Sequence, residues 1–395
     1  MTPSRWVSSG IVVIALFFAV TSGDSATVWA QSPESTSPIQ LIPRTKEERE
    51  RRYQAEHRIV LNLQVTDSSG KPVAGLKPED LELLDNQKPQ MIATFREVNG
   101  QTSTADVHLF FVLDAINDGG AAIGHARKDL DKYLSQGQGP LPFPISLVFV
   151  SSAGQTVTPP STDRAVVADQ LAKFARLPRD SDCDQARYTD GSRMGGQALG
   201  SHSYGNSVEE RADCMISHFT ESVNALGTLI TEQKNVRGRA ILIWTGPGWP
   251  VLADFGTQAV GQRGNYRDVL VELNTNLREA QVTLDALSWG GFETPKNVRK
   301  PIVSATTSVP STVDELAETT MTLPALARQS GGQAISNVKN FAGAMAACLA
   351  DAGDFYMLSF DSTPAATTDE FHSIEVKIDR PGMNVRTVTG YYAQP

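Results

Sequence analysis

The stretch Val107-His-Leu-Phe-Phe-Val-Leu-Asp114-Ala-Ile-Asn117-Asp118-Gly-Gly decides the fold. Its first seven residues are mostly apolar, and such a run predicts a strand that is buried on both faces of a sheet. The run ends in three side chains with oxygen atoms, and a helical pattern follows. Ligands of open α/β sheets bind beyond the carboxyl ends of the strands. Asp114, Asn117 and Asp118 are therefore candidate ligands for a hard cation such as Mg²⁺ or Ca²⁺.

Residues 106–352 alternate apolar strands with helical patterns. Further strands are predicted at 145–150, 240–244 and 282–287, with a weak one near 333–336, and helices at 121–134, 163–176, 207–233, 265–280, 322–330 and 340–350. This alternation predicts an α/β domain whose parallel-rich sheet carries helices on both faces.

The segments 58–100 and 353–395 follow the two-residue period of strands instead. Ile59, Leu61, Leu63 and Val65 alternate with other residues in the first segment, and 354–360, 373–379 and 385–391 alternate in the second. About forty residues are too few to close a sandwich alone. We therefore expect the N- and C-terminal strands to build one β-sandwich, with the α/β domain inserted between them. A separate C-terminal β-module is the alternative.

The first 30 residues have the pattern of a signal peptide. Arg5 precedes an apolar core of about ten residues, Ile11–Val20, and Val28-Trp-Ala30 resembles a cleavage site. Because spanning a bilayer takes about 20 apolar residues, we expect no stable membrane span after cleavage. An uncleaved anchor is the alternative. Residues 31–57 read as a linker, and the mature chain is expected in the periplasm, at the cell surface or secreted.

Composition narrows the classes of partner. The formal net charge is -9 at pH 7, and no basic run offsets it. This charge argues against nucleic acid and against an anionic membrane surface as partners, because both are themselves negatively charged.

The chain has three cysteines, Cys183, Cys214 and Cys348, and their spacing suggests which of them form a disulfide. In an oxidising compartment Cys183 and Cys214 can close a loop of about thirty residues as a disulfide. Cys348 lies in an Ala-rich helical pattern and is expected to be a buried free thiol. A zinc site built from Cys183, Cys214 and nearby histidines is the other interpretation, although the spacing matches no usual zinc finger.

Residues 58–395 resemble the von Willebrand factor A-related domain proteins of the acidobacterial type. The matching stretches are Val65-Thr-Asp-Ser-Ser-Gly-Lys-Pro-Val-Ala-Gly-Leu76, the end of the strand at Asp114 and Asn117, Arg239-Ala-Ile-Leu-Ile-Trp244, and Val376-Lys-Ile-Asp-Arg-Pro-Gly382 followed by Gly390-Tyr-Tyr392. The resemblance implies an exported protein with an A-type α/β core, which in other proteins is a binding module.

The resemblance also implies a metal-dependent adhesion site, from which this sequence departs. The usual site has Asp-x-Ser-x-Ser after the first strand, but here Ile116 and Asp118 occupy the two Ser positions. The usual later Asp would fall within Thr245-Gly246-Pro247, where no carboxylate stands. A hydroxyl ligand would come from Thr158, Ser161 or Thr162. The predicted metal set, Asp114, Asn117, Asp118 and Ser161, is therefore a degenerate one.

Trp244, Trp249 and Trp289 fall at or just beyond predicted strand ends, on the same side as Asp114. Three Trp side chains at one rim are typical of an aromatic binding surface. The alternative is that each covers the top of the core.

No His-Glu-x-x-His, Gly-x-Ser-x-Gly or Gly-x-x-x-x-Gly-Lys motif occurs in the chain. We therefore do not expect an enzyme. The sequence favours an exported protein-interaction or adhesion module that binds a protein partner of unknown identity. A metal-independent structural envelope protein is one alternative, and a hydrolase that uses loop residues is another.

Overall fold

The computed structural model describes residues 58–98, 107–117, 121–174, 208–236, 238–249, 256–290, 292 and 323–395. All of these residues belong to one compact unit, Leu41–Pro395. The predicted signal peptide (1–30) and linker (31–57) lie outside the described residues, as do Asp118 and Cys183.

The central sheet has six strands and contains the buried stretch Val107–Asp114 as β5. Its strand order is β10-β9-β8-β5-β6-β7. Four long neighbours run parallel, namely β5 (Val107–Asp114), β6 (Ile145–Ser151), β8 (Arg239–Thr245) and β9 (Val282–Leu287), and β10 (Ala334–Ile335) is parallel to β9. The edge strand β7 (Gly154–Val157), which periodicity did not predict, is antiparallel to β6. The sheet is therefore mixed but mainly parallel, with β5 between β6 and β8.

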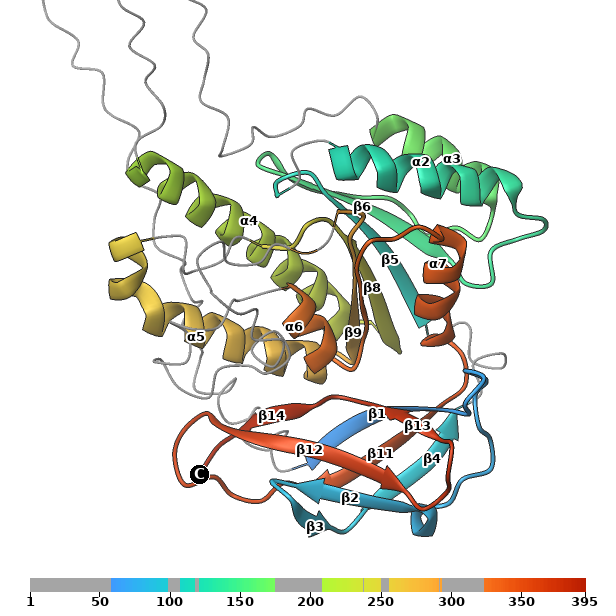
Figure 1. Ribbon diagram of the computed structural model, residues 1–395, viewed down its shortest axis with the longest axis vertical. Helices are drawn as coiled ribbons and strands as arrows, with labels where there is room; N and C mark the ends of the chain where they lie inside the picture. Colours follow the sequence, from blue (N-terminus) through green and yellow to red (C-terminus); the bar gives the residue numbers. More distant parts are fainter. Residues whose placement is uncertain are drawn as a thin grey trace, which may run out of the picture. The chain divides into compact units, whose positions relative to one another are not determined.

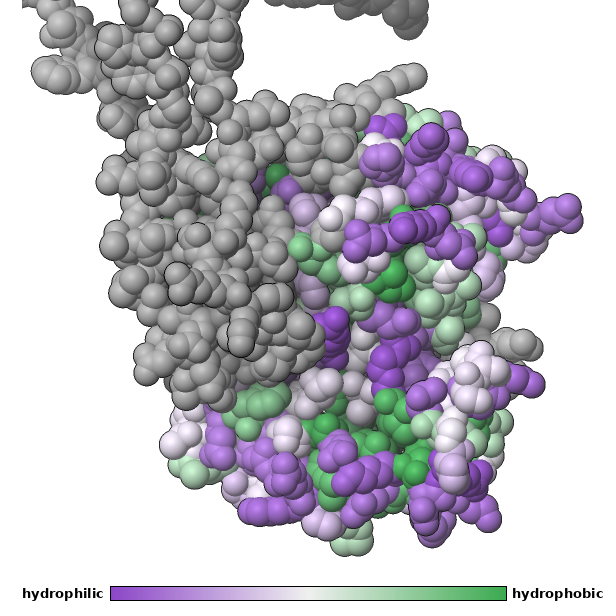
Figure 2. All heavy atoms as spheres, in the orientation of Figure 1, coloured by the Kyte–Doolittle hydropathy of each residue, from purple (hydrophilic) through white to green (hydrophobic). Residues whose placement is uncertain are grey.

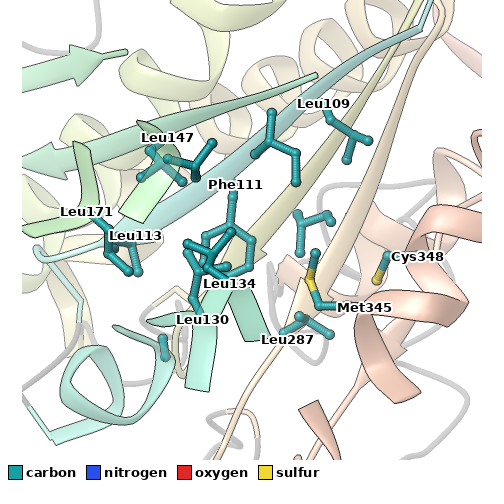
Figure 3. Packing of buried hydrophobic residues seen from close by; sticks show 14 of the residues in the cluster. Leu109, Phe111, Leu113, Leu130, Leu134, Leu147, Leu171, Leu287, Met345 and Cys348 are labelled. Atoms are coloured by element: carbon teal, nitrogen blue, oxygen red, sulfur yellow. The ribbon is translucent and has the colours of Figure 1, made fainter. Parts of the chain in front are cut away.

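Helices cover both faces of this sheet (Figure 1). One face carries α2 (Ala121–Gln136), α3 (Arg164–Phe174) and α7 (Phe341–Ala350), and the other carries α4 (Val208–Lys234), α5 (Gly256–Glu279) and α6 (Leu323–Gln329). Figure 3 shows Phe111 and Leu113 of β5 packing with Leu130 and Leu134 of α2. Successive strand residues point to opposite faces, so a continuous apolar run such as β5 supplies both cores.

The helix α5 begins earlier than the sequence predicted. Periodicity indicated a start at Asn265, whereas the helix begins at Gly256. Gly256, Gly261 and Gly264 have low helix propensity and dilute the apolar pattern of the first turns.

The outward surface over α2 and α3 is mostly hydrophilic (Figure 2), as expected for helices whose other side packs on a sheet.

Strands from the two ends of the chain form two four-stranded antiparallel sheets. The first has the order β13-β1-β11-β4 and consists of β13 (Asn384–Arg386), β1 (Arg58–Thr66), β11 (Phe355–Asp361) and β4 (Thr94–Val98). The second has the order β14-β12-β2-β3 and consists of β14 (Gly390–Ala393), β12 (Glu370–Ile378), β2 (Leu81–Asp85) and β3 (Lys88–Gln90). A short 3-10 helix, Pro78–Asp80, leads into β2.

One hydrophobic core lies between these two sheets, so they make a sandwich. Ile59, Leu61 and Leu63 of β1 are fully buried in it, opposite Phe360, Leu358 and Tyr356 of β11 respectively. The alternation in the sequence of β1 is thus the alternation between the core face and the outer face of its sheet.

None of the described helices combines the length and apolar character that crossing a bilayer requires.

We predict that Leu358→Ala lowers the free energy of unfolding by about 2 to 5 kcal/mol, because the change leaves a cavity at a side chain that is fully buried between the two sheets. Met91→Ala is the matched control, since Met91 is 86% exposed and its loss should cost less than about 0.5 kcal/mol. Urea denaturation followed by circular dichroism measures both. Equal effects of the two substitutions would contradict the packing described for the sandwich.

Candidate functional site

Asp114 lies at the carboxyl end of β5, where its side chain is almost fully buried. Its Oδ1 accepts the backbone N–H groups of Ile116 and Asn117 at 3.1 and 3.2 Å. Its Oδ2 accepts the side-chain N–H of Asn117 at 2.8 Å and the indole N–H of Trp244 at 3.0 Å. Each carboxylate oxygen therefore accepts two donors, and both are occupied by groups of the chain itself.

Trp244 reaches Asp114 because β8 is the parallel neighbour of β5. The register places Trp244 opposite Val112, so the indole lies beside the end of β5. After Trp244, the Thr245 hydroxyl donates to the backbone carbonyl of Val112 at 2.8 Å. Gly246 then adopts φ +151°, and a Cβ there would lie 3.6 Å from the Cβ of Asp114. Residues 244–246 thus supply an indole donor and a closely packed backbone at the end of β5, and no carboxylate.

Asn117 connects this strand end to α4. Its side-chain nitrogen donates to Asp114 and also, at 2.6 Å, to the hydroxyl oxygen of Ser222. Its Oδ1 is buried and accepts no hydrogen bond from the part of the chain that the structure describes. Sequence reasoning missed Ser222. The sequence did hold one indication of its role. Ser222 interrupts the apolar stripe of α4 next to Val223, and a polar side chain that is buried in such a stripe needs a hydrogen-bond partner.

The electrostatics of Asp114 explain this set of donors. Burial raises the pKa of Asp114, whereas the N–H groups of Asn117, Trp244 and Ile116 act in the opposite direction. Removal from water penalises a carboxylate, and hydrogen bonds to its charged form offset that penalty. The donors therefore supply the positive partial charge that a cation would supply in a metal site.

The structure brings together only part of the predicted metal set: Asn117 lies against Asp114, whereas Ser161 does not. Ser161 pairs with Ile145, and Ile145 lies beside Leu109 in the register of β5 and β6. Leu109 and Asp114 are five residues apart, which is roughly 16 Å along a strand. Placing Ser161 beside Asp114 was therefore wrong, because an antiparallel return through β7 carries the chain back to the other end of the sheet. Asp118 lies outside the described residues. Within the described ranges, no three His, Cys, Asp or Glu side chains are grouped closely enough to hold a metal ion.

The prediction that Trp244, Trp249 and Trp289 form one exposed binding rim is also wrong. Trp244 and Trp249 are 0% and 1% exposed. Their rings meet edge to face with centroids 6.2 Å apart, and Trp249 meets Phe219 of α4 in the same way at 5.7 Å. These two tryptophans fill the core under α4 and present no surface for a partner. Such apolar side chains at a strand end are buried when a helix crosses above them.

Trp289 is the one of the three that is only partly buried. Its indole N–H donates to a carboxylate oxygen of Asp129 on α2 at 2.8 Å, and its ring stacks on Phe341 of α7 with centroids 5.9 Å apart. It packs against the other helical layer from Trp244 and Trp249, so the three do not form a single aromatic surface.

The structure describes two of the three cysteines, Cys214 and Cys348. Cys214 is disulfide-bonded, and its sulfur lies 3.8 Å from Nε2 of His218. The predicted partner, Cys183, lies outside the described residues. Cys348 is a buried free thiol, which confirms that expectation.

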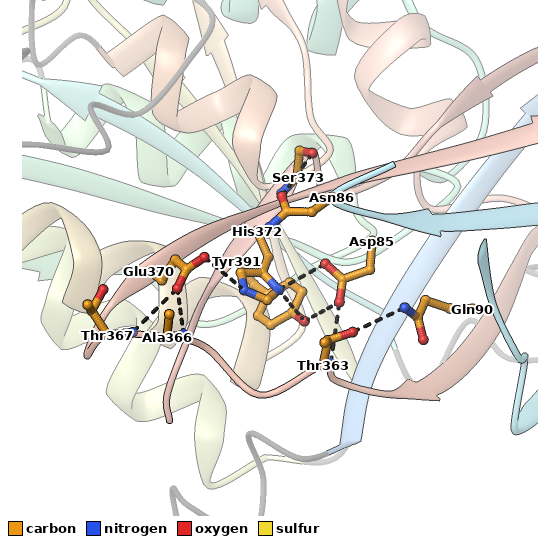
Figure 4. Close-up of polar contacts among 10 residues, drawn as sticks. All are labelled: Asp85, Asn86, Gln90, Thr363, Ala366, Thr367, Glu370, His372, Ser373 and Tyr391. Carbon is orange, nitrogen blue, oxygen red and sulfur yellow. Dashed lines mark hydrogen bonds and ion pairs between the residues drawn. The ribbon is translucent and has the colours of Figure 1, made fainter. Parts of the chain in front are cut away.

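A histidine and an aspartate meet in the sandwich, at a place that the sequence did not single out (Figure 4). Nδ1 of His372 on β12 lies 2.9 Å from Oδ1 of Asp85 on β2, and the hydroxyl of Tyr391 on β14 donates to Oδ2 of Asp85 at 2.9 Å. All three residues are at most 3% exposed. Burial is the main cause that raises the pKa of Tyr391, so this hydroxyl stays a donor. The cluster therefore ties three strands together and offers no open face to a substrate.

We predict that Trp244→Phe lowers the free energy of unfolding by about 1 to 3 kcal/mol, because it removes one donor from a buried carboxylate while keeping an aromatic ring. Trp289→Phe is the matched control, since it removes the same kind of indole–carboxylate bond at a partly buried position where water can replace the donor. Its cost should be below about 1 kcal/mol. Chemical denaturation of both variants provides the comparison, and a Trp244 effect no larger than that of Trp289 would refute this account of Asp114.

Neither a family model nor a curated protein matches this sequence. Among solved structures, the manganese-loaded TRAP protein of Plasmodium vivax is similar with a TM-score of 0.29 and 10% identity, over 80% of this chain and 100% of that one. The human COPII-coat protein Sec24c is similar with a TM-score of 0.29 and 9% identity, over 76% of this chain and 46% of that one. Similarities at this level carry no argument about the site, which rests on its own geometry.

Proposed function

We propose that this chain is an exported protein-binding module of the von Willebrand factor A type, in which hydrogen-bond donors have replaced the cation at the end of β5. The observation that carries the proposal is the carboxylate of Asp114, whose two oxygens accept four N–H groups. In this proposal the strand-end site survives as a fixed structural element and works without metal.

The cost of admitting a cation supports the metal-independent form. A cation at Asp114 would have to displace N–H donors from a buried carboxylate, and each hydrogen bond to a charged group is worth about 1.5 to 3 kcal/mol. Trp244 would also have to leave a packed position between β5, Trp249 and α4. Serine hydroxyls, which would compensate as ligands in the usual site, are replaced here by Ile116 and Asp118.

The arrangement of the chain supports a binding role. The mainly parallel sheet with helices on both faces is a scaffold whose strand ends usually present ligand sites. The only carboxylate that the described part of β5 and β8 brings to that edge is Asp114, and it is committed to structural hydrogen bonds. The His372–Asp85 pair is buried in the sandwich. These observations favour recognition of a protein partner over hydrolysis.

Two features support export. The first 30 residues have the pattern of a signal peptide. Cys214 is disulfide-bonded, and disulfides persist mainly in oxidising compartments outside the cytosol. The proposed location is therefore the periplasm, the cell surface or the surrounding medium.

We predict that calorimetric titration of the protein with Mg²⁺, Mn²⁺ or Ca²⁺ at millimolar concentration gives only heats of dilution, and that the thermal unfolding midpoint does not move. A bound cation would raise that midpoint by mass action. Saturable binding that is lost in Asp114→Asn would overturn the metal-independent form.

The binding role itself needs a partner. We expect crosslinking of the tagged protein in its native envelope to recover the same partner protein with and without a chelator. Loss of that partner on chelation would restore the metal-dependent alternative. Recovery of no specific partner would favour a purely structural envelope protein.

A further inference from the structure

We draw no further inference here: the strongest candidate, the hollow that Arg239 and Asp351 border between β1 and the start of β9, has both of these charges balanced within the fold, and nothing in the structure shows what would occupy it.

Discussion

The antiparallel pairing of β1 with β11 is the interaction on which the rest of the structure depends. It joins Arg58 to Asp361 and continues to Leu63 and Tyr356, so the α/β part lies inside a loop that this pairing closes. The entropy cost of closing a loop grows only with the logarithm of its length, by about 0.6 kcal/mol for each doubling. A large insertion is therefore tolerated, provided that the closing strands bury enough apolar surface. In β1 this surface comes from Ile59, Leu61 and Leu63, and in the neighbouring strand β11 it comes from Leu358 and Phe360.

The fold deals with its buried carboxyl groups in three ways. Asp114 accepts four N–H donors, Asp85 contacts a histidine and a tyrosine, and Asp351 forms an ion pair with Arg386. Each solution removes or compensates the cost of a charge in a medium of low dielectric constant. At Asp114 the donors come from neighbouring strands and turns rather than from a ligand. These donors are the basis of the metal-independent form that we propose for the strand-end site.

Local patterns and long-range placement differ in how far the sequence predicts them. Strand β5, the helices on both faces and the alternating strands at the two ends follow from periodicity, because the period of burial is a local property of the chain. The position of Ser161 does not follow, because an antiparallel edge strand with weak periodicity, β7, changes which end of the sheet it reaches. The burial of Trp244 and Trp249 does not follow either, because it depends on α4 crossing above them. Ser222 and His372 gain their roles only from partners distant in sequence.

The sequence by itself determined that β5 is a buried strand ending in Asp114, that the segment around Gly246 carries no carboxylate, and that the chain ends are strands. These are statements about residue type and local period. Only the tertiary structure decided what Asp114 binds, because the indole of Trp244 reaches it through the register of β5 and β8. Only the tertiary structure brought Asp351 and Arg386 together. Hydrogen bonds and charges act over a few ångströms, and sequence separation does not reveal which groups come within that range.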